Sequence, residues 1–262
     1  MRKLYIYCGA ILLLIAVCLA FFTVQPVMFP LDTLPTENLH LTEGDPDKPP
    51  DTIAPIEEPE DTEKPEEPIP YDCPEKLTKA REQNSDVYAW INVPGTNIDY
   101  PVVQSPTNDS YYLRRDINEQ YLSAGSIMSE HSYNGTDFTD PVTVIYGHCM
   151  KSGAMFGNMQ TYYSSENGLE NYKTIEIYLP DKKLEYEVFA AVPYDMRHIL
   201  YNYDFTNPRI FSSFFKSIVS IRAFNANIKA EEKPRYGDKV LILSTCLKGD
   251  STKRYLVLAK LK

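Results

Sequence analysis

The sequence predicts a mainly β domain, folded as a closed or partly closed barrel with a few helices outside it, and one transmembrane helix before it. Three observations predict this arrangement. The chain after residue 70 consists largely of short runs rich in Val, Ile and Tyr between turn residues, which is typical of strands. One longer stretch among them has helical periodicity. The first 24 residues hold an apolar run long enough to cross a bilayer.

The N-terminal segment has the features of an uncleaved membrane anchor. From Leu4 to Val24 there are 21 residues without a charge, and a spanning helix needs roughly 20. Arg2 and Lys3 precede this run and acidic residues follow it, which predicts a cytoplasmic N-terminus and an extracellular remainder. A cleaved signal peptide is the alternative, but the run exceeds the usual ~7–15 residues and no A-x-A-like site follows. A lipoprotein at Cys18 is disfavoured because no small residue precedes it. Residues 1–24 are therefore predicted to be a single-pass anchor in the cell membrane.

Residues 25–70 are predicted to be a disordered extracellular tether. Twelve of the 20 prolines fall between Pro26 and Pro74, and residues 43–72 hold twelve Asp and Glu against two Lys. Such a stretch buries too little apolar surface to fold, and proline with like-charge repulsion keeps it extended. Its balance of −10 equals the net charge of the whole chain, so the remainder is close to neutral. This excludes the basic face of a nucleic-acid-binding protein.

Residues 71–262 form the predicted folded domain. "CPEKLTKAREQNSDVYAWI" predicts one short helix, followed by a second turn into Trp90. Seven or eight strands come next, in the runs "INVPGTNIDYPVVQ", "GSIMSE", "PVTVIYGH", "KTIEIYLP", "LEYEVFAAVPY", "DKVLILSTC" and "RYLVLAKLK". Residues 181–183 separate two of them tightly enough for a hairpin. Before the last two, "NPRIFSSFFKSIVSIRAF" predicts an amphipathic helix from its apolar spacing at Ile210, Phe214, Ile218 and Ile221.

Three residues could carry chemistry in this domain. His148 and Cys246 end, or nearly end, predicted strands, where side chains converge on a cleft. A thiolate is a usable nucleophile that a neighbouring cation favours, and an imidazole can hand a proton to a leaving amine. Arg254, across a predicted hairpin from Cys246, keeps its charge and could bind an oxyanion. The alternative is that Cys246 is a small buried apolar residue. No CxxC pair or Cys/His ligand spacing indicates a zinc site.

Four blocks of the chain, in order, resemble those of the class B sortases, the cysteine transpeptidases of Gram-positive bacteria. They are "VYAWINVPGTNIDYPVVQ", "YYLRRDINEQYLSAGSIMSE", "VIYGHCMKSGAMFGNM" and "LILSTCLKGDSTKRYLVLAKL", which together cover roughly Val87 to Lys260. The resemblance implies an eight-stranded sortase barrel with a helix in the connection before the cysteine strand. It implies Cys246 as nucleophile, His148 as general acid/base and Arg254 as substrate and oxyanion clamp. No metal or organic cofactor is implied.

The resemblance also implies substrates and partners. The expected substrates are secreted proteins with a C-terminal sorting motif of the NPQTN, NPKTG or LPXTG kind, cleaved after threonine. The expected acceptor is an amine of the peptidoglycan cross-bridge or of its lipid-linked precursor. Positions that line the substrate groove in relatives correspond here to Ser244, Thr245, Tyr146 and Leu113. Two alternatives stay open: a pilin polymerase that uses a lysine amine, and a tethered wall-binding β-domain without enzymatic activity.

One position departs from the class B pattern. Relatives usually have Asn after the histidine, and this chain has Cys149. Strand alternation predicts that Cys149 points away from the His148 face, in a packing or surface role. A sharper hypothesis is that Cys149 forms a disulfide with Cys246 under oxidising conditions and switches the enzyme off.

Overall fold

The computed structural model describes residues 71–262. The predicted anchor, residues 1–24, and the predicted tether, residues 25–70, lie outside the described residues. Within the described part of the chain, no helix is long and apolar enough to span a membrane.

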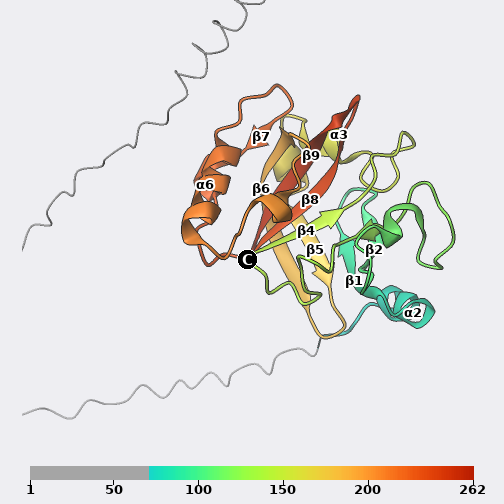
Figure 1. The fold of residues 1–262 in the computed structure, drawn as a ribbon. Helices are drawn as coiled ribbons and strands as arrows, with labels where there is room; N and C mark the ends of the chain where they lie inside the picture. The colour runs from blue at the N-terminus through green and yellow to red at the C-terminus, as the bar shows by residue number, and fades with distance from the viewer. Residues whose placement is uncertain (1–70) are drawn as a thin grey trace, which may run out of the picture. The chain divides into compact units, whose positions relative to one another are not determined.

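The domain is a closed β-barrel (Figure 1). Its strands are β1 (Val87–Asn92), β2 (Asp99–Val103), β3 (Ile127–Met128), β4 (Val142–Tyr146), β5 (Thr174–Tyr178), β6 (Lys183–Tyr194), β7 (Asn227–Ile228), β8 (Val240–Leu247) and β9 (Asp250–Leu261). Neighbouring strands follow the order β5-β1-β2-β3-β4-β8-β9-β6, and the β5–β6 pairing closes the ring. The short β7 pairs with β6 beside this ring. The predicted eight-stranded barrel is therefore confirmed, with β7 as an addition.

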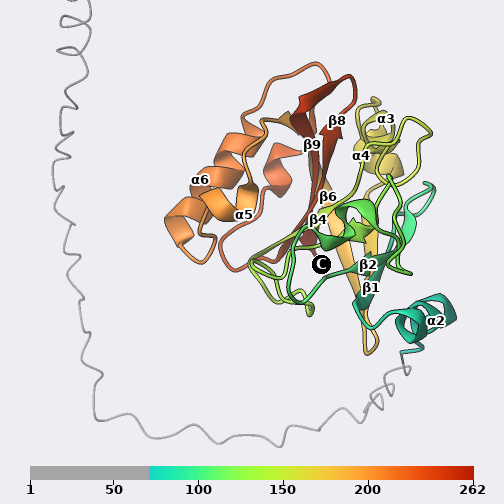
Figure 2. The same cartoon turned by 45° about the vertical axis from the view of Figure 1, so that its right-hand side comes forward.

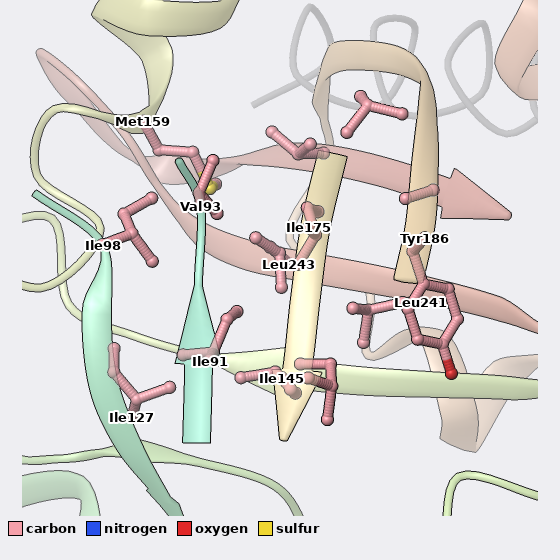
Figure 3. Packing of buried hydrophobic residues seen from close by; sticks show 14 of the residues in the cluster. Ile91, Val93, Ile98, Ile127, Ile145, Met159, Ile175, Tyr186, Leu241 and Leu243 are labelled. Carbon is pink, nitrogen blue, oxygen red and sulfur yellow. The ribbon is translucent and has the colours of Figure 1, made fainter. Parts of the chain in front are cut away.

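The barrel interior is filled by one set of alternating side chains. Figure 3 shows Leu241 and Leu243 of β8 pointing into this core beside Ile145 of β4. All three are fully buried. Because side chains alternate along a strand, the residues between them point to the opposite, outer face. On β8 these are Val240 and Ile242, which belong to a second apolar cluster.

Helix α6 (Pro208–Val219) covers this outer face, together with the short α5 (Ile199–Asn202), as seen in Figure 2. The side chain of Asn207 caps α6 by accepting hydrogen bonds from the first-turn amides, and proline occupies the first helical position. The buried stripe is Phe211, Phe214, Phe215 and Ile218. The predicted helix is confirmed, but its apolar face is shifted: Ile210 is only half-buried, and Ile221 lies beyond the helix end.

The remaining helices lie at the periphery. They are α2 (Glu75–Gln83), α3 (Met159–Tyr163) and α4 (Gly168–Asn171), with short 3-10 turns η1 (Tyr111–Arg114) and η2 (Ala230–Glu232). The predicted N-terminal helix is α2, whose Leu77 and Ala80 pack beside β1 and β2. The second turn predicted into Trp90 is wrong. Trp90 lies within β1, paired with Pro101 of β2, because sheet pairing decides the conformation of this apolar run.

Candidate active site

Strand register brings three of the predicted residues to one end of the outer face. In the antiparallel β8–β9 hairpin, Cys246 pairs directly with Arg254. In the parallel β4–β8 pair, Tyr146 is level with Ser244. Two positions after these residues come His148 and Cys246, which are therefore expected at the same height as each other. Cys246, Arg254 and His148 thus share the face that α6 covers further along the same strands.

The Cys246 thiol and the Arg254 guanidinium are in contact. Arg254 Nη1 donates to Cys246 Sγ at 3.5 Å. The same nitrogen also approaches the carbonyl oxygens of Ser251 and Lys253, at 3.3 and 3.4 Å. These carbonyls belong to the hairpin itself, so they hold the guanidinium over the thiol. A cation in this position stabilises the thiolate or a nearby oxyanion.

His148 lies just after β4 rather than in it, because the strand ends at Tyr146. The intervening Gly147 is required by packing, since a Cβ there would lie 2.7 Å from the ring of Phe156. The imidazole Nε2 is 2.9 Å from the carbonyl oxygen of Leu113 in η1, an arrangement in which Nε2 donates. Within residues 71–262, His148 makes no hydrogen bond to Cys246. Leu113 therefore positions the imidazole in the absence of a substrate.

These residues line one pocket of about 260 Å³. Its walls include all seven residues predicted for the site: His148, Cys246, Arg254, Ser244, Thr245, Tyr146 and Leu113. Leu113 is 45% exposed at the mouth of the pocket. Ser244 and Thr245 are buried, and the Thr245 hydroxyl donates to the carbonyl of Gly147 at 2.6 Å. That bond ties the end of β8 to the turn that carries His148.

The pocket also has walls that the sequence did not indicate. One is the connection after β6, from which Met196, Arg197 and His198 line the pocket. Another is the segment after β3, which contributes Glu130. None of these residues was singled out from the sequence. The signal that could have singled out His198 is its position at the start of a helix, since His198 caps α5 by accepting a hydrogen bond from the Tyr201 amide.

Cys149 is not among the residues that line the pocket. Burial raises the pKa of its thiol, and the nearby Cys246 adds to this effect. Cys73, Cys149 and Cys246 are free thiols in the structure. The disulfide between Cys149 and Cys246 stays a prediction. For residues 71–262, no three His, Cys, Asp or Glu side chains gather as a metal site would require.

A closed barrel with Cys, Arg and His lining one pocket suits the class of enzymes that use a thiol nucleophile. The sortase domain family matches residues 91–262. The chain belongs to the sortase family and is a cysteine transpeptidase of that family.

Within the family the chain is sortase B-like. Sortase B of Listeria monocytogenes is 30% identical over 192 residues, which cover 69% of this chain and 70% of that protein. The X-ray structure of Clostridium perfringens sortase B matches with a TM-score of 0.61 at 28% identity, covering 71% of this chain and 98% of that one. A Streptococcus pyogenes class B sortase involved in pilus biogenesis matches with a TM-score of 0.61 at 26% identity, covering 71% and 98%.

Proposed function

We propose that this sortase cleaves a C-terminal sorting motif after its threonine and transfers the protein to a cell-wall peptidoglycan amine. The observation that carries the proposal is the contact between Cys246 Sγ and Arg254 Nη1, 3.5 Å apart in a pocket that His148 also lines. A nucleophile, a fixed cation and a proton carrier are the groups that acyl transfer through a thioester requires.

In the first half-reaction, the Cys246 thiolate attacks the threonine carbonyl carbon. The carbonyl oxygen becomes an oxyanion, and the Arg254 guanidinium stabilises it because this cation is already held beside the sulfur. The carbon–nitrogen bond then breaks. The leaving amine takes a proton from His148, which leaves an acyl group on sulfur.

In the second half-reaction, the acceptor amine attacks the thioester carbon. His148 takes the proton from this amine, the carbon–sulfur bond breaks, and the Cys246 thiolate is restored. His148 is held by the Leu113 carbonyl rather than by the thiol. The imidazole therefore faces the pocket independently of Cys246, as a group that serves two different amines in turn must.

The substrate groove is assigned to the remaining lining residues. Leu113 at the mouth offers apolar surface to an incoming peptide, and Tyr146 and Ser244 form the wall beside the nucleophile. Thr245 holds the end of β8 in place instead of binding substrate, because its hydroxyl already donates a hydrogen bond to the Gly147 carbonyl.

We further propose that residues 1–24 anchor the enzyme in the cell membrane with the N-terminus in the cytoplasm. Residues 25–70 would then hold the catalytic domain in the extracellular wall space. The support is the uncharged 21-residue run after Arg2 and Lys3 and the proline-rich acidic stretch that follows. This places the pocket near secreted substrates and lipid-linked wall precursors.

A second candidate function is polymerisation of pilin subunits, with a lysine side chain as the acceptor. The likeness to the Streptococcus pyogenes class B sortase involved in pilus biogenesis favours it. Both functions share the first half-reaction and differ only in the acceptor.

The test combines the full-length chain with sorting-motif peptides and follows the products by mass spectrometry, with and without triglycine. We expect a cleaved peptide joined to triglycine. Transfer to a pilin-type lysine peptide but not to triglycine would favour the second function. A thiol that is inert toward electrophiles, together with intact peptide, would contradict both and indicate a binding domain without activity.

A further inference from the structure

A second polar centre lies in the wall of the pocket, apart from the thiol. It consists of Glu130, His198 and Tyr146, which all line the pocket. Glu130 Oε2 is 2.8 Å from His198 Nε2. The mechanism proposed above uses neither of these two residues.

Both ring nitrogens of His198 are already engaged in hydrogen bonds. Its Nδ1 accepts from the Tyr201 amide at 3.1 Å, so the ring proton is on Nε2 and is donated to Glu130. A second proton on Nδ1 would break the cap of α5. His198 therefore offers the carboxylate a single N–H donor, and its other ring nitrogen stays engaged in the cap of α5.

The Glu130 carboxylate is short of partners. Its side chain is 16% exposed, and among the described residues His198 is the one side chain that donates to it at hydrogen-bond distance. Arg197, which lines the same pocket, is engaged in a fork with Asp195 at 2.6 and 2.9 Å. A carboxylate in such surroundings is poorly solvated and favours an incoming N–H donor.

The Tyr146 hydroxyl is buried, and it also lacks a hydrogen-bond partner among the described residues. Burial and, after it, the neighbouring Glu130 carboxylate raise the pKa of this phenol far above its ordinary range. A buried polar atom without a partner is rare in a folded protein and calls for a ligand or a water.

We propose that Glu130, together with the Tyr146 hydroxyl, is a specificity-determining subsite that receives the side-chain N–H donor of a lysine, glutamine or asparagine in the sorting motif. A carboxylate favours the lysine ammonium over the carboxamides, because hydrogen bonds between two charged groups are the stronger ones. This inference rests on the proposed function, because it assumes that a peptide enters the pocket to reach Cys246. It adds a group that selects the substrate without touching the reacting atoms.

Asp109 is the rival carboxylate in the same pocket. Its Oδ1 already faces His131 Nδ1 at 2.6 Å and the Ser132 amide at 3.2 Å. These partners hold the pKa of the Asp109 carboxyl below its usual value in spite of its burial. Asp109 therefore has two hydrogen-bond partners, whereas His198 is the one side chain that donates to Glu130 among the described residues.

The test uses the full-length chain and peptides based on Asn-Pro-Lys-Thr-Gly. Each residue before the threonine is in turn lysine, glutamine or norleucine, which has the length of lysine without a donor. The measured quantity is kcat/KM for acylation of Cys246, kept separate from transfer to triglycine. At one position we expect lysine to exceed norleucine by about 10- to 100-fold, the size of a hydrogen bond to a charged group.

Glu130→Gln should reduce that lysine preference to a few-fold while glutamine and lysine become nearly equal, and Tyr146→Phe should reduce it partially. Asp109→Asn, the matched control, should retain it. The subsite is overturned if Glu130→Gln keeps the preference, if Asp109→Asn removes it instead, or if Glu130→Gln affects only the transfer step. Absence of acylation with every peptide, with a reactive Cys246, would contradict the proposed function itself and the subsite with it.

Discussion

The two ends of the outer face of the barrel are built from the same strands but differ in their surroundings. At one end, Val240 and Ile242 of β8 lie under α6 in a cluster that excludes water. At the other end, Ser244 and Cys246 of the same strand face an open pocket. The alternation of side chains continues without a break between them, and only the covering helix stops.

This difference teaches how the site gets its precision. Cys246 and Arg254 are held by strand register rather than by a flexible loop, and the buried end of the strands fixes that register. Substitutions at the covered end should therefore change the free energy of unfolding but leave the catalytic activity of the folded molecules unchanged. Substitutions at the open end should do the reverse.

The largest effect is expected from Cys246→Ala. Removing the proposed nucleophile should lower peptide cleavage by on the order of 10⁴-fold or more, because the remaining groups cannot form the thioester. The half-exposed thiol contributes little to packing, so the urea unfolding midpoint should barely move. Cys149→Ala is the control and should keep its activity; loss of cleavage there would mean that the wrong thiol has been assigned.

At the covered end, Phe215→Ala should cost about 3–5 kcal/mol of unfolding free energy. Phe215 is fully buried, and its ring packs against Phe189, Phe205, Phe211 and Phe214. The measurement is urea denaturation followed by circular dichroism. Phe224→Ala removes a fully exposed ring just past the helix and should change stability by less than about 0.5 kcal/mol. Equal effects from the two variants would refute the contrast between the ends.

Arg254→Lys should lower kcat/KM for acylation by about 10²–10³-fold, or roughly 2.7–4 kcal/mol, as loss of an oxyanion donor does. A lysine keeps the charge but cannot reach the oxyanion and the hairpin carbonyls with one planar group. Lys253→Ala, which removes the neighbouring exposed cation, serves as control. Steady-state kinetics with a fluorescent peptide would measure kcat/KM for both variants. Similar losses in the two variants would mean that Arg254 acts only through its positive charge and not as an oxyanion donor.

Glu130→Gln should give the smallest effect, a stabilisation of about 0.5–2 kcal/mol at neutral pH, as relief of a functional polar site often does. Burial raises the pKa of the Glu130 carboxyl, while the neighbouring His198 opposes this and Asp109 adds to it. A raised pKa means that wild-type stability is lost as pH rises through the titration of this group. The gain in the variant should therefore grow from acid to neutral pH.

Thermal unfolding at several pH values would measure this trend. Glu82→Gln, at an exposed position on α2, should show none of it. A gain that is constant with pH would contradict the assignment of the effect to the buried charge.

Much of this fold could be predicted from the sequence because its strands carry strong local signals. The apolar runs of β8 and β9, the turn at residues 179–182 and the periodicity before residue 219 act within a few residues. Trp90 was misplaced because pairing with β2, a tertiary contact, decides its conformation. The face of α6 was shifted because four aromatic and aliphatic side chains at 211, 214, 215 and 218 fit the sheet together, which spacing alone does not reveal.

For the pocket, local patterns in the sequence indicated residues at strand ends, and the family resemblance added Leu113 in η1. Both missed the residues contributed by the connections after β3 and β6. Cys246 and Arg254 are eight positions apart across one hairpin, so their meeting follows from local geometry. Glu130 and His198 are 68 positions apart and meet only because the connection after β6 folds over the outer face. No periodicity marks such a pair.

The most direct test of the central claim is to locate the acyl group on the chain. The full-length protein is incubated with a sorting-motif peptide without any amine, digested with pepsin at low pH to preserve thioesters, and analysed by tandem mass spectrometry. The proposed mechanism predicts the acyl mass on Cys246 and its disappearance when triglycine is added before digestion. An acyl group on Cys149 or Cys73, or cleavage that proceeds without any acylated cysteine, would contradict it.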